Sequence, residues 1–341
     1  MIILGIETSC DETAIGVLKA ENKKFEILSN VVASQVKLHQ KYGGVYPFLA
    51  KREHQKNLPV VFEKATKGIP LSKIDLIGVT IGPGLEPCLW QGINFAKNLA
   101  KKLKLPIVPV NHLEAHILVN FLDFPKNKIF PALCLVVSGG HTLLFLMEKI
   151  GKYKIIGQTR DDAAGECLDK TGRLLGLKYP AGPKIEKLAK KYFKKENSFG
   201  ISLPRPMIYQ KNYDFSFAGL KTAVLYEIKK QKGKIKKEYI LEMAKEIQQA
   251  VIDVLIKKTL RGAREFKVKS IFLGGGVVAN ENLREQFKEK IKKELPFLKI
   301  FFPKKEFCQD NGIMVAVCAF FHRKKAKKKL EKIRALDNLQ I

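Results

Sequence analysis

The chain has 341 residues, enough for about two domains of ordinary size, and its 46% of hydrophobic residues is typical of a folded globular protein. No apolar stretch reaches the roughly 18 residues that a membrane-spanning helix needs, and six scattered cysteines without a Cys-x-x-Cys pair favour free thiols in a reducing, cytoplasmic setting. The formal net charge of +29 leaves two explanations open, which are a polyanionic partner such as nucleic acid and a generally lysine-rich, solvated surface.

The chain opens on an apolar run at residues 2–6, which no basic segment precedes. It is therefore predicted to be a core strand and not a signal peptide. A polar turn rich in hydroxyl and carboxyl groups follows at residues 7–12, and a second strand is predicted over residues 13–18. Further on, an apolar strand at residues 76–81 enters the sequence Gly-Pro-Gly and then a helix.

His112 and His116 are four residues apart, in the sequence His-Leu-Glu-Ala-His. On a helix this spacing places both imidazoles on one face, separated by about 6 Å of rise, which is close enough to bind one metal ion. Two solvated polar residues would show the same spacing. A zinc peptidase of the His-Glu-x-x-His type is disfavoured, because Leu113 stands where its general base would be and the glutamate is displaced to Glu114.

The apolar strand at residues 132–137 runs into the turn Ser138-Gly139-Gly140-His141 and then into a strand at residues 142–146. Glycines let backbone N–H groups approach an anion closely, so this turn is a candidate phosphate-binding loop. Later, the strand at residues 270–273 enters three consecutive glycines and a helix that starts near Ala279.

Asp310 is the carboxylate best placed in the sequence to complete a metal site with the two histidines. It also precedes an apolar helical run at residues 313–319, so capping of that helix is the alternative interpretation. The run of basic residues at 323–329 resembles the arms that contact phosphates without sequence specificity.

Two arrangements of elements each occur twice, and in the same order. One is a strand, a turn with hydroxyl groups and a second strand, and the other is a strand, a glycine loop and a helix. We therefore predict an α/β protein of two similar lobes with the layout of the actin, Hsp70 and sugar-kinase (ASKHA) superfold, whose nucleotide cleft lies between the lobes. The predicted domains are an N-terminal lobe at 1–111, a C-terminal lobe with the metal and adenylate loops at 112–309, and a helix that returns toward the N-terminal lobe with the basic tail at 310–341.

Taken together, these motifs resemble the bacterial tRNA threonylcarbamoyladenosine transferase family, which is related to the catalytic subunit of the KEOPS complex and was long described as an O-sialoglycoprotein endopeptidase. The resemblance covers nearly the whole chain. The segments that carry it are residues 5–13, 42–45, 112–116, 137–142, 161–166, 169–171, 214–222, 274–277, Asn280 and 310–312.

The resemblance implies transfer of the threonylcarbamoyl group from threonylcarbamoyl-AMP to the adenosine 3′ of the anticodon, in tRNAs that read codons beginning with A. It aligns His112, His116 and Asp310 with the ligands of a divalent metal, for which it favours Fe(II), while the ligand types suit Zn(II) equally. It also implies a paralogous inactive partner subunit, a small ATPase and no membrane. The residues it aligns with adenylate binding are Val136, Val137, Ser138, Gly139, Gly140, Asp169, Gly182 and Asn280.

These assignments have a physical basis. Backbone N–H groups of the turn could hold phosphate oxygens, Asp169 could accept from sugar hydroxyls, and Asn280 could contact the nucleoside. A pairing with Arg173 one helical turn away is the alternative for Asp169. An adenine amine is a poor nucleophile, so a carboxylate base is expected, with Asp11 and Glu12 as the candidates.

A kinase of the same superfold, a metallopeptidase and a non-enzymatic scaffold are the competing interpretations. A kinase would place an aspartate in the first phosphate turn as its metal anchor, whereas the anchor here is the two-histidine site. Two departures from the family pattern are Ala181 before Gly182, where two glycines are usual, and Phe48 after Pro47, where a glutamate is usual.

Overall fold

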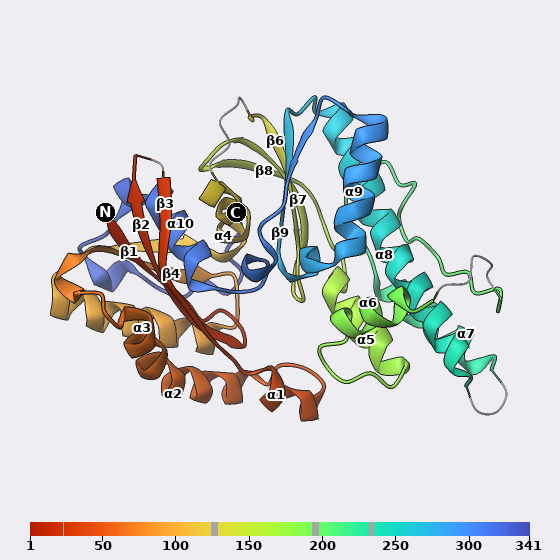
Figure 1. The fold of residues 1–341 in the computed structure, drawn as a ribbon, viewed down its shortest axis with the longest axis horizontal. Helices are drawn as coiled ribbons and strands as arrows, with labels where there is room; N and C mark the ends of the chain where they lie inside the picture. The colour runs from red at the N-terminus through yellow and green to blue at the C-terminus, as the bar shows by residue number, and fades with distance from the viewer. Residues whose placement is uncertain (23, 124–128, 193–197, 232–234) are drawn as a thin grey trace. The chain divides into compact units, whose positions relative to one another are not determined.

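The computed structural model describes residues 1–22, 24–123, 129–192, 198–231 and 235–341. The chain divides into two compact units, one formed by Met1–Lys128 with Pro303–Ile341 and the other by Ile129–Phe302 (Figure 1). The predicted lobe boundaries at 111/112 and 309/310 fall inside the first unit, which therefore contains both histidines and Asp310. None of the helices in the described residues is long and apolar enough to cross a membrane.

The first unit is built on a five-stranded sheet with the order β3-β2-β1-β4-β5. Its strands are β1 (Ile2–Glu7), β2 (Glu12–Glu21), β3 (Lys24–Ser34), β4 (Ile74–Gly82) and β5 (Ile107–Asn111). The strands β1, β2 and β3 pair antiparallel, while β4 and β5 continue the sheet in parallel from β1. The helices are α1 (Val36–His39), α2 (Pro47–Thr66), α3 (Glu86–Leu103), α4 (His112–Leu118) and α10 (Gly312–Phe321).

The second unit repeats this topology with the order β10-β9-β6-β7-β8. Its strands are β6 (Ala132–Val137), β7 (Thr142–Lys149), β8 (Lys152–Gln158), β9 (Ser270–Gly274) and β10 (Lys299–Phe301). The strands β6, β7 and β8 are antiparallel, and β9 and β10 extend the sheet in parallel from β6. The helices are α5 (Ala164–Leu174), α6 (Gly182–Lys190), α7 (Ala218–Lys229), α8 (Lys237–Glu265) and α9 (Glu281–Glu294).

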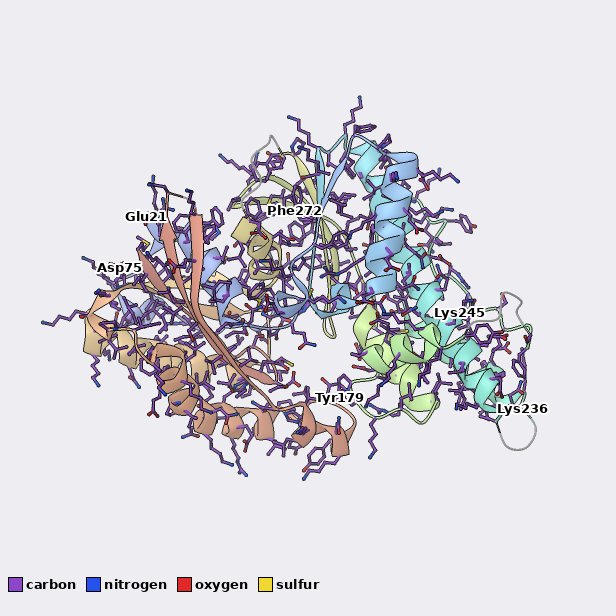
Figure 2. The ribbon with its side chains drawn as sticks, in the orientation of Figure 1. Glu21, Asp75, Tyr179, Lys236, Lys245 and Phe272 are labelled. Carbon is purple, nitrogen blue, oxygen red and sulfur yellow. The ribbon has the colours of Figure 1, made fainter. Side chains whose placement is uncertain are left out.

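The predicted duplication is confirmed, because β1, β2 and β4 have the same pairing in the first sheet as β6, β7 and β9 in the second. The helix predicted near Ala279 begins at Glu281, after a short 3-10 turn. Each sheet has its own apolar core. In the second sheet, Phe272 lies on β9 (Figure 2). Its ring stacks on that of Phe301 of β10, with 4.6 Å between ring centroids.

The helix α10 is packed tightly against the first sheet. A Cβ atom added to Gly5 of β1 would lie 2.1 Å from the Gly312 carbonyl oxygen, and one added to Gly312 would lie 1.9 Å from the Gly16 nitrogen. Because side chains are absent at these three positions, the start of the helix can approach the strands at backbone distance. The packing fixes the segment just before the helix, which contains Asp310.

The basic tail does not extend from the molecule as an arm, contrary to the interpretation of residues 323–329 as a free phosphate-binding segment. Lys327 exchanges backbone hydrogen bonds of 3.0 and 2.7 Å with Ile107 of β5. Beyond it, Leu330 and Ile333 are buried in the first core, and Leu336 donates its N–H to the Ile81 carbonyl at 2.8 Å. Apolar side chains spaced three residues apart and backbone hydrogen bonds thus anchor the tail, while its lysines stay exposed.

Candidate metal centre and phosphate turn

The two histidines lie on α4, which starts directly where β5 ends. Asn111 caps this helix, since its side-chain oxygen accepts from the N–H groups of Leu113 at 2.9 Å and Glu114 at 3.1 Å. Every residue of the helix is buried, so both imidazoles are withdrawn from solvent. The interpretation of the pair as solvated surface residues is therefore wrong.

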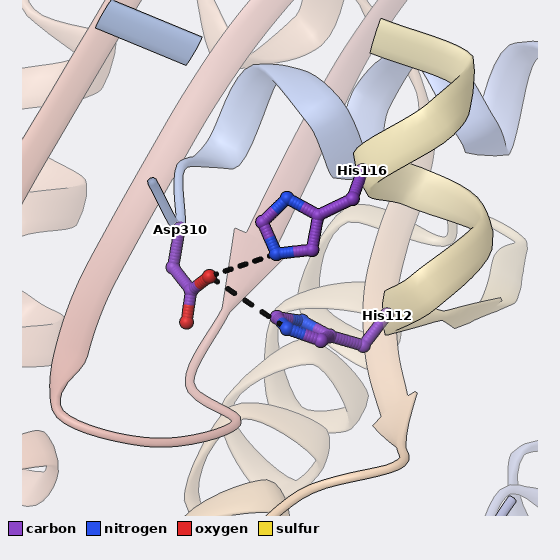
Figure 3. Close-up of side chains that lie close together, drawn as sticks. All are labelled: His112, His116 and Asp310. Carbon is purple, nitrogen blue, oxygen red and sulfur yellow. Dashed lines mark ion pairs between the residues drawn. The ribbon is translucent and has the colours of Figure 1, made fainter. Parts of the chain in front are cut away.

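Asp310 joins the two histidines at one point (Figure 3). Its Oδ1 lies 3.1 Å from Nε2 of His116 and 3.6 Å from Nε2 of His112, and the three ligand atoms lie within 4.8 Å of one another. The alternative role of Asp310 as a helix cap is wrong. Asn311 caps α10 instead, accepting from the N–H of Met314 at 2.9 Å.

His116 carries a buried polar group that this arrangement leaves unsatisfied. Although its Nε2 lies near Asp310, neither ring nitrogen makes a hydrogen bond of good geometry within the described residues. Unsatisfied buried polar atoms are costly, and a bound cation would satisfy this one. Two imidazoles and one carboxylate, with remaining positions open, fit a divalent transition metal such as Zn(II) or Fe(II).

Glu7, which is not among the site residues predicted from the sequence, also belongs to this centre. Its Oε2 lies 3.3 Å from Nδ1 of His112 and accepts from the Thr80 hydroxyl at 2.6 Å, while Oε1 accepts from the Ser9 N–H at 2.6 Å. A carboxylate on the far nitrogen of a metal-binding imidazole fixes its tautomer and orientation. The signal was the charged residue that ends an otherwise apolar first strand.

The charges of the centre reinforce one another. Burial alone would raise the pKa of Glu7, but the His112 imidazole outweighs it and lowers that pKa. Burial likewise opposes charge on His112, yet Asp310 and Glu7 raise the pKa of His112 to about 9. The carboxylates therefore favour a positive charge at this point, which is the electrostatic requirement of a cation site.

The candidate bases lie in the first unit, with Asp11 in the turn between β1 and β2 and Glu12 at the start of β2. Asp11 is buried, and its Oδ2 has no hydrogen-bond partner in the described part of the chain. Burial, together with the charges of Asp11 and Asp310, raises the pKa of Glu12 well above its usual range. A carboxyl that retains its proton is a poor base, so Asp11 is the better of the two candidates.

In the second unit, the candidate phosphate turn joins β6 to β7. The Ser138 N–H donates to the His141 carbonyl at 2.8 Å, and the His141 N–H donates to the Ser138 hydroxyl at 3.1 Å. Gly139 and Gly140 are exposed, and an added Cβ on either would meet no atom within 4 Å. The turn is thus rigid and its glycines face open space.

The preceding valines are enclosed. Val136 and Val137 are buried in β6, which pairs with β7 and, at Val136, with β9. A Cβ added to Gly275 would lie 2.4 Å from the Val137 carbonyl oxygen. The glycine loop after β9 therefore lies directly against the end of β6, and the valines contribute by positioning the turn.

The three other predicted adenylate residues lie on or beside helices of the same unit: Asp169 within α5, Gly182 at the start of α6, and Asn280 at the N-terminal cap of α9. Asp169 Oδ1 accepts from the Ala181 N–H at 2.6 Å, which ties α5 to the start of α6 at Gly182. Asn280 caps α9 by accepting from Leu283 at 2.9 Å and donates to Gln248 at 2.8 Å. Structural roles are therefore present at Asp169 and Asn280.

The chain is similar in sequence to proteins of a known family. The model of the TsaD family, described as tRNA N6-adenosine threonylcarbamoyltransferase, matches residues 26–317. The protein of that name from Thermosipho africanus is 45% identical over the full length of both chains. Those from Thermosipho melanesiensis and Thermotoga neapolitana are 48% and 46% identical, over 94% and 93% of this chain and 94% and 92% of theirs.

Solved structures with little sequence likeness share the fold. HypF from T. kodakarensis aligns over 96% of this chain and 48% of its own, with a TM-score of 0.58 and 15% identity. Component A of (R)-2-hydroxyglutaryl-CoA dehydratase from Acidaminococcus fermentans aligns over 97% and 100%, with a TM-score of 0.52 and 15% identity. A ROK family glucokinase from Streptomyces griseus aligns over 94% and 99%, with a TM-score of 0.51 and 10% identity. These likenesses confirm the α/β architecture of the actin, Hsp70 and sugar-kinase superfold.

Proposed function

The chain belongs to the tRNA N6-adenosine threonylcarbamoyltransferase family, so it is a transferase that modifies tRNA, and we propose that it uses the His112, His116 and Asp310 centre together with the Ser138–Gly140 turn. The observation that carries the proposal is the convergence of three metal-binding side chains on one buried point. The donor in this proposal is threonylcarbamoyl-AMP, and the acceptor is the adenosine 3′ of the anticodon in tRNAs that read codons beginning with A.

In the proposed transfer, different residues bind the adenylate and the metal ion. Backbone N–H groups of Gly139 and Gly140 hold the adenylate phosphate, while Asp169 and Asn280 contact the nucleoside. A divalent ion on the two histidines and Asp310 would polarise the carbamoyl carbonyl or neutralise the departing phosphate. Fe(II) and Zn(II) are the candidate ions.

Asp11 completes the proposed reaction. The adenosine N6 amine attacks the carbamoyl carbon, a new N–C bond forms, and the bond from that carbon to the phosphate oxygen breaks. AMP leaves with the bonding electron pair, and the Asp11 carboxylate accepts the proton that the amine loses. The buried Asp11 Oδ2 supports this role because no hydrogen bond within the described residues satisfies it.

Reconstitution tests the proposal. Protein, tRNA, threonine, bicarbonate and ATP are incubated with the adenylate-forming enzyme, the paralogous inactive subunit and the small ATPase that we propose as partners, and the tRNA is then digested to nucleosides. Wild-type protein should produce threonylcarbamoyladenosine, and Asp310→Asn should lose both the product and bound metal. The matched control is Asp123→Asn, which removes an exposed carboxylate of the same unit. Full activity in metal-free Asp310→Asn protein would overturn the proposal.

A further inference from the structure

A second cluster of metal-binding side chains lies on the other side of α4. Glu114 stands between His112 and His116 in sequence, so helical geometry directs it away from them. Its Oε1 lies 2.5 Å from Nε2 of His322, the C-cap residue that follows α10. With the thiol of Cys318 on α10, their ligand atoms all lie within 4.8 Å of one another.

The local structure holds these three groups together. Cys318 and His322 are four residues apart, and the His322 N–H donates to the Cys318 carbonyl at 3.1 Å, so both lie on one face at the end of α10. Cys318 is fully buried, whereas the side chains of Glu114 and His322 are 10% and 11% exposed. The cluster is therefore enclosed by protein and still in contact with solvent.

We propose that Glu114, Cys318 and His322 form a second metal site, for a borderline-soft divalent cation of the Zn(II) class, that joins α4 to the end of α10. Thiolate, imidazole and carboxylate are the ligand types that such an ion prefers, and a water can occupy the fourth tetrahedral position. Binding displaces the thiol proton of Cys318 to solvent, because the thiolate is the ligand. This site is separate from the proposed reaction centre and does not depend on the proposed function.

The competing interpretation is a buried hydrogen bond between His322 and Glu114, beside which the cysteine has no role. Burial and the adjacent Glu114 carboxylate raise the pKa of the Cys318 thiol, so it stays protonated in the absence of an ion. The two interpretations therefore differ in whether the thiol becomes a ligand. A probe that reports a metal–sulfur bond distinguishes them.

Cobalt(II) is that probe. The full-length protein is stripped of metal with a chelator, titrated with Co(II), and followed by its absorption spectrum and by elemental analysis. We expect two bound ions per chain and a thiolate-to-cobalt charge-transfer band in the near ultraviolet. Cys318→Ala should bind one ion and lose the band, whereas His116→Ala should bind one ion and retain it.

Two further variants keep the test decisive. Cys10→Ala removes another thiol of the first unit, which lies near Asp310, and should leave the band unchanged. His322→Asn, at a partly exposed helix end, should lose the band without depending on how well the core tolerates a change at Cys318. The absence of a charge-transfer band from the wild type, or its persistence in both Cys318→Ala and His322→Asn, would overturn the proposal.

Discussion

At the scale of single residues, His112 shows how a buried carboxylate prepares an imidazole for a metal. Glu7 accepts on the Nδ1 side, so the imidazole donates from Nδ1, and Nε2, which faces Asp310, is the nitrogen that coordinates the metal. A glutamine at position 7 could instead donate to Nδ1 and favour the tautomer whose Nε2 carries the proton.

We therefore expect Glu7→Gln to weaken metal binding by about 10- to 100-fold without loss of the fold. Competition with a chelator of known affinity measures this change, and thermal unfolding of the metal-free protein monitors stability. Glu63→Gln, a change at an exposed glutamate on α2, is the control. Unchanged affinity in Glu7→Gln would show that this carboxylate does not orient His112.

The glycines of the phosphate turn allow a second test at this scale. An added Cβ at Gly140 meets no atom within 4 Å, so the fold should accept Gly140→Val while the new side chain blocks the approach of phosphate. Titration with a non-hydrolysable adenylate analogue should show a loss of at least about tenfold in affinity, which corresponds to about 1.4 kcal/mol. The same change at Gly219, which also faces open space, should not affect binding. Equal affinity of the Gly140 and Gly219 variants for the adenylate analogue would show that the turn is only a hairpin connection.

Lys258 on α8 connects a buried charge to the pH dependence of stability. Its Nζ donates to the Asn212 carbonyl at 3.2 Å, and burial, with a smaller effect of Arg261, lowers its pKa to about 8. The unfolded state, with a lysine pKa of about 10.4, binds more protons between these values, so the contribution of Lys258 to stability rises with pH from about 8 to 10.4.

Lys258→Met should remove that dependence. Arg261 also donates to the Asn212 carbonyl, at 2.6 Å, so the variant does not leave this acceptor unpaired. Thermal unfolding of both proteins between pH 7 and 10 should show the wild type gaining stability relative to the variant as the pH rises above 8. A difference that is constant over this range would mean that Lys258 is charged in the fold.

At the scale of elements, strands were predictable and the contacts between distant segments were not. Apolar runs that end in polar or glycine turns located β1, β2, β4, β6, β7 and β9, and their repeated order gave the duplicated topology. The strands β3, β5, β8 and β10 were missed, and β3 in particular mixes exposed and partly buried residues without an apolar run. Glu7 was missed because its role depends on His112, which is remote in sequence.

The packing of α10 depends on glycine pairs that no local pattern reveals, and it leads to a test. A side chain at Gly312 would overlap the backbone of Gly16, so Gly312→Ala should displace the start of the helix and Asp310 with it. We expect a destabilisation of about 1–3 kcal/mol and loss of bound metal. Gly276→Ala, where an added Cβ meets no atom within 4 Å, is the control. Full metal content in a destabilised Gly312→Ala protein would separate the metal centre from this packing.

At the scale of the whole molecule, the net charge of +29 and the substrate class suit one another, because tRNA is a polyanion. The structure changes how this can be tested. Deleting the tail from Arg323 onward would remove Leu330 and Ile333 from the first core, so weaker binding by a truncated protein would report damage to the fold.

Charge is therefore better removed without removing the segment. Lys324, Lys325, Lys328 and Lys329 are exposed, and replacing them with glutamine leaves the buried anchors of the tail in place. If these lysines contact tRNA, each lost phosphate contact should lower the slope of log affinity against log salt by roughly 0.7 to 0.9. Binding titrations at several salt concentrations measure this slope, with adenylate affinity as the internal control because the proposed adenylate turn lies in the other unit.

A second variant, with glutamine at Lys288, Lys290, Lys292 and Lys293 of α9, loses the same amount of charge as the tail variant and serves for comparison. Identical slopes for wild type and tail variant, with a reduced slope for the α9 variant, would show that tRNA contacts the second unit and not the tail.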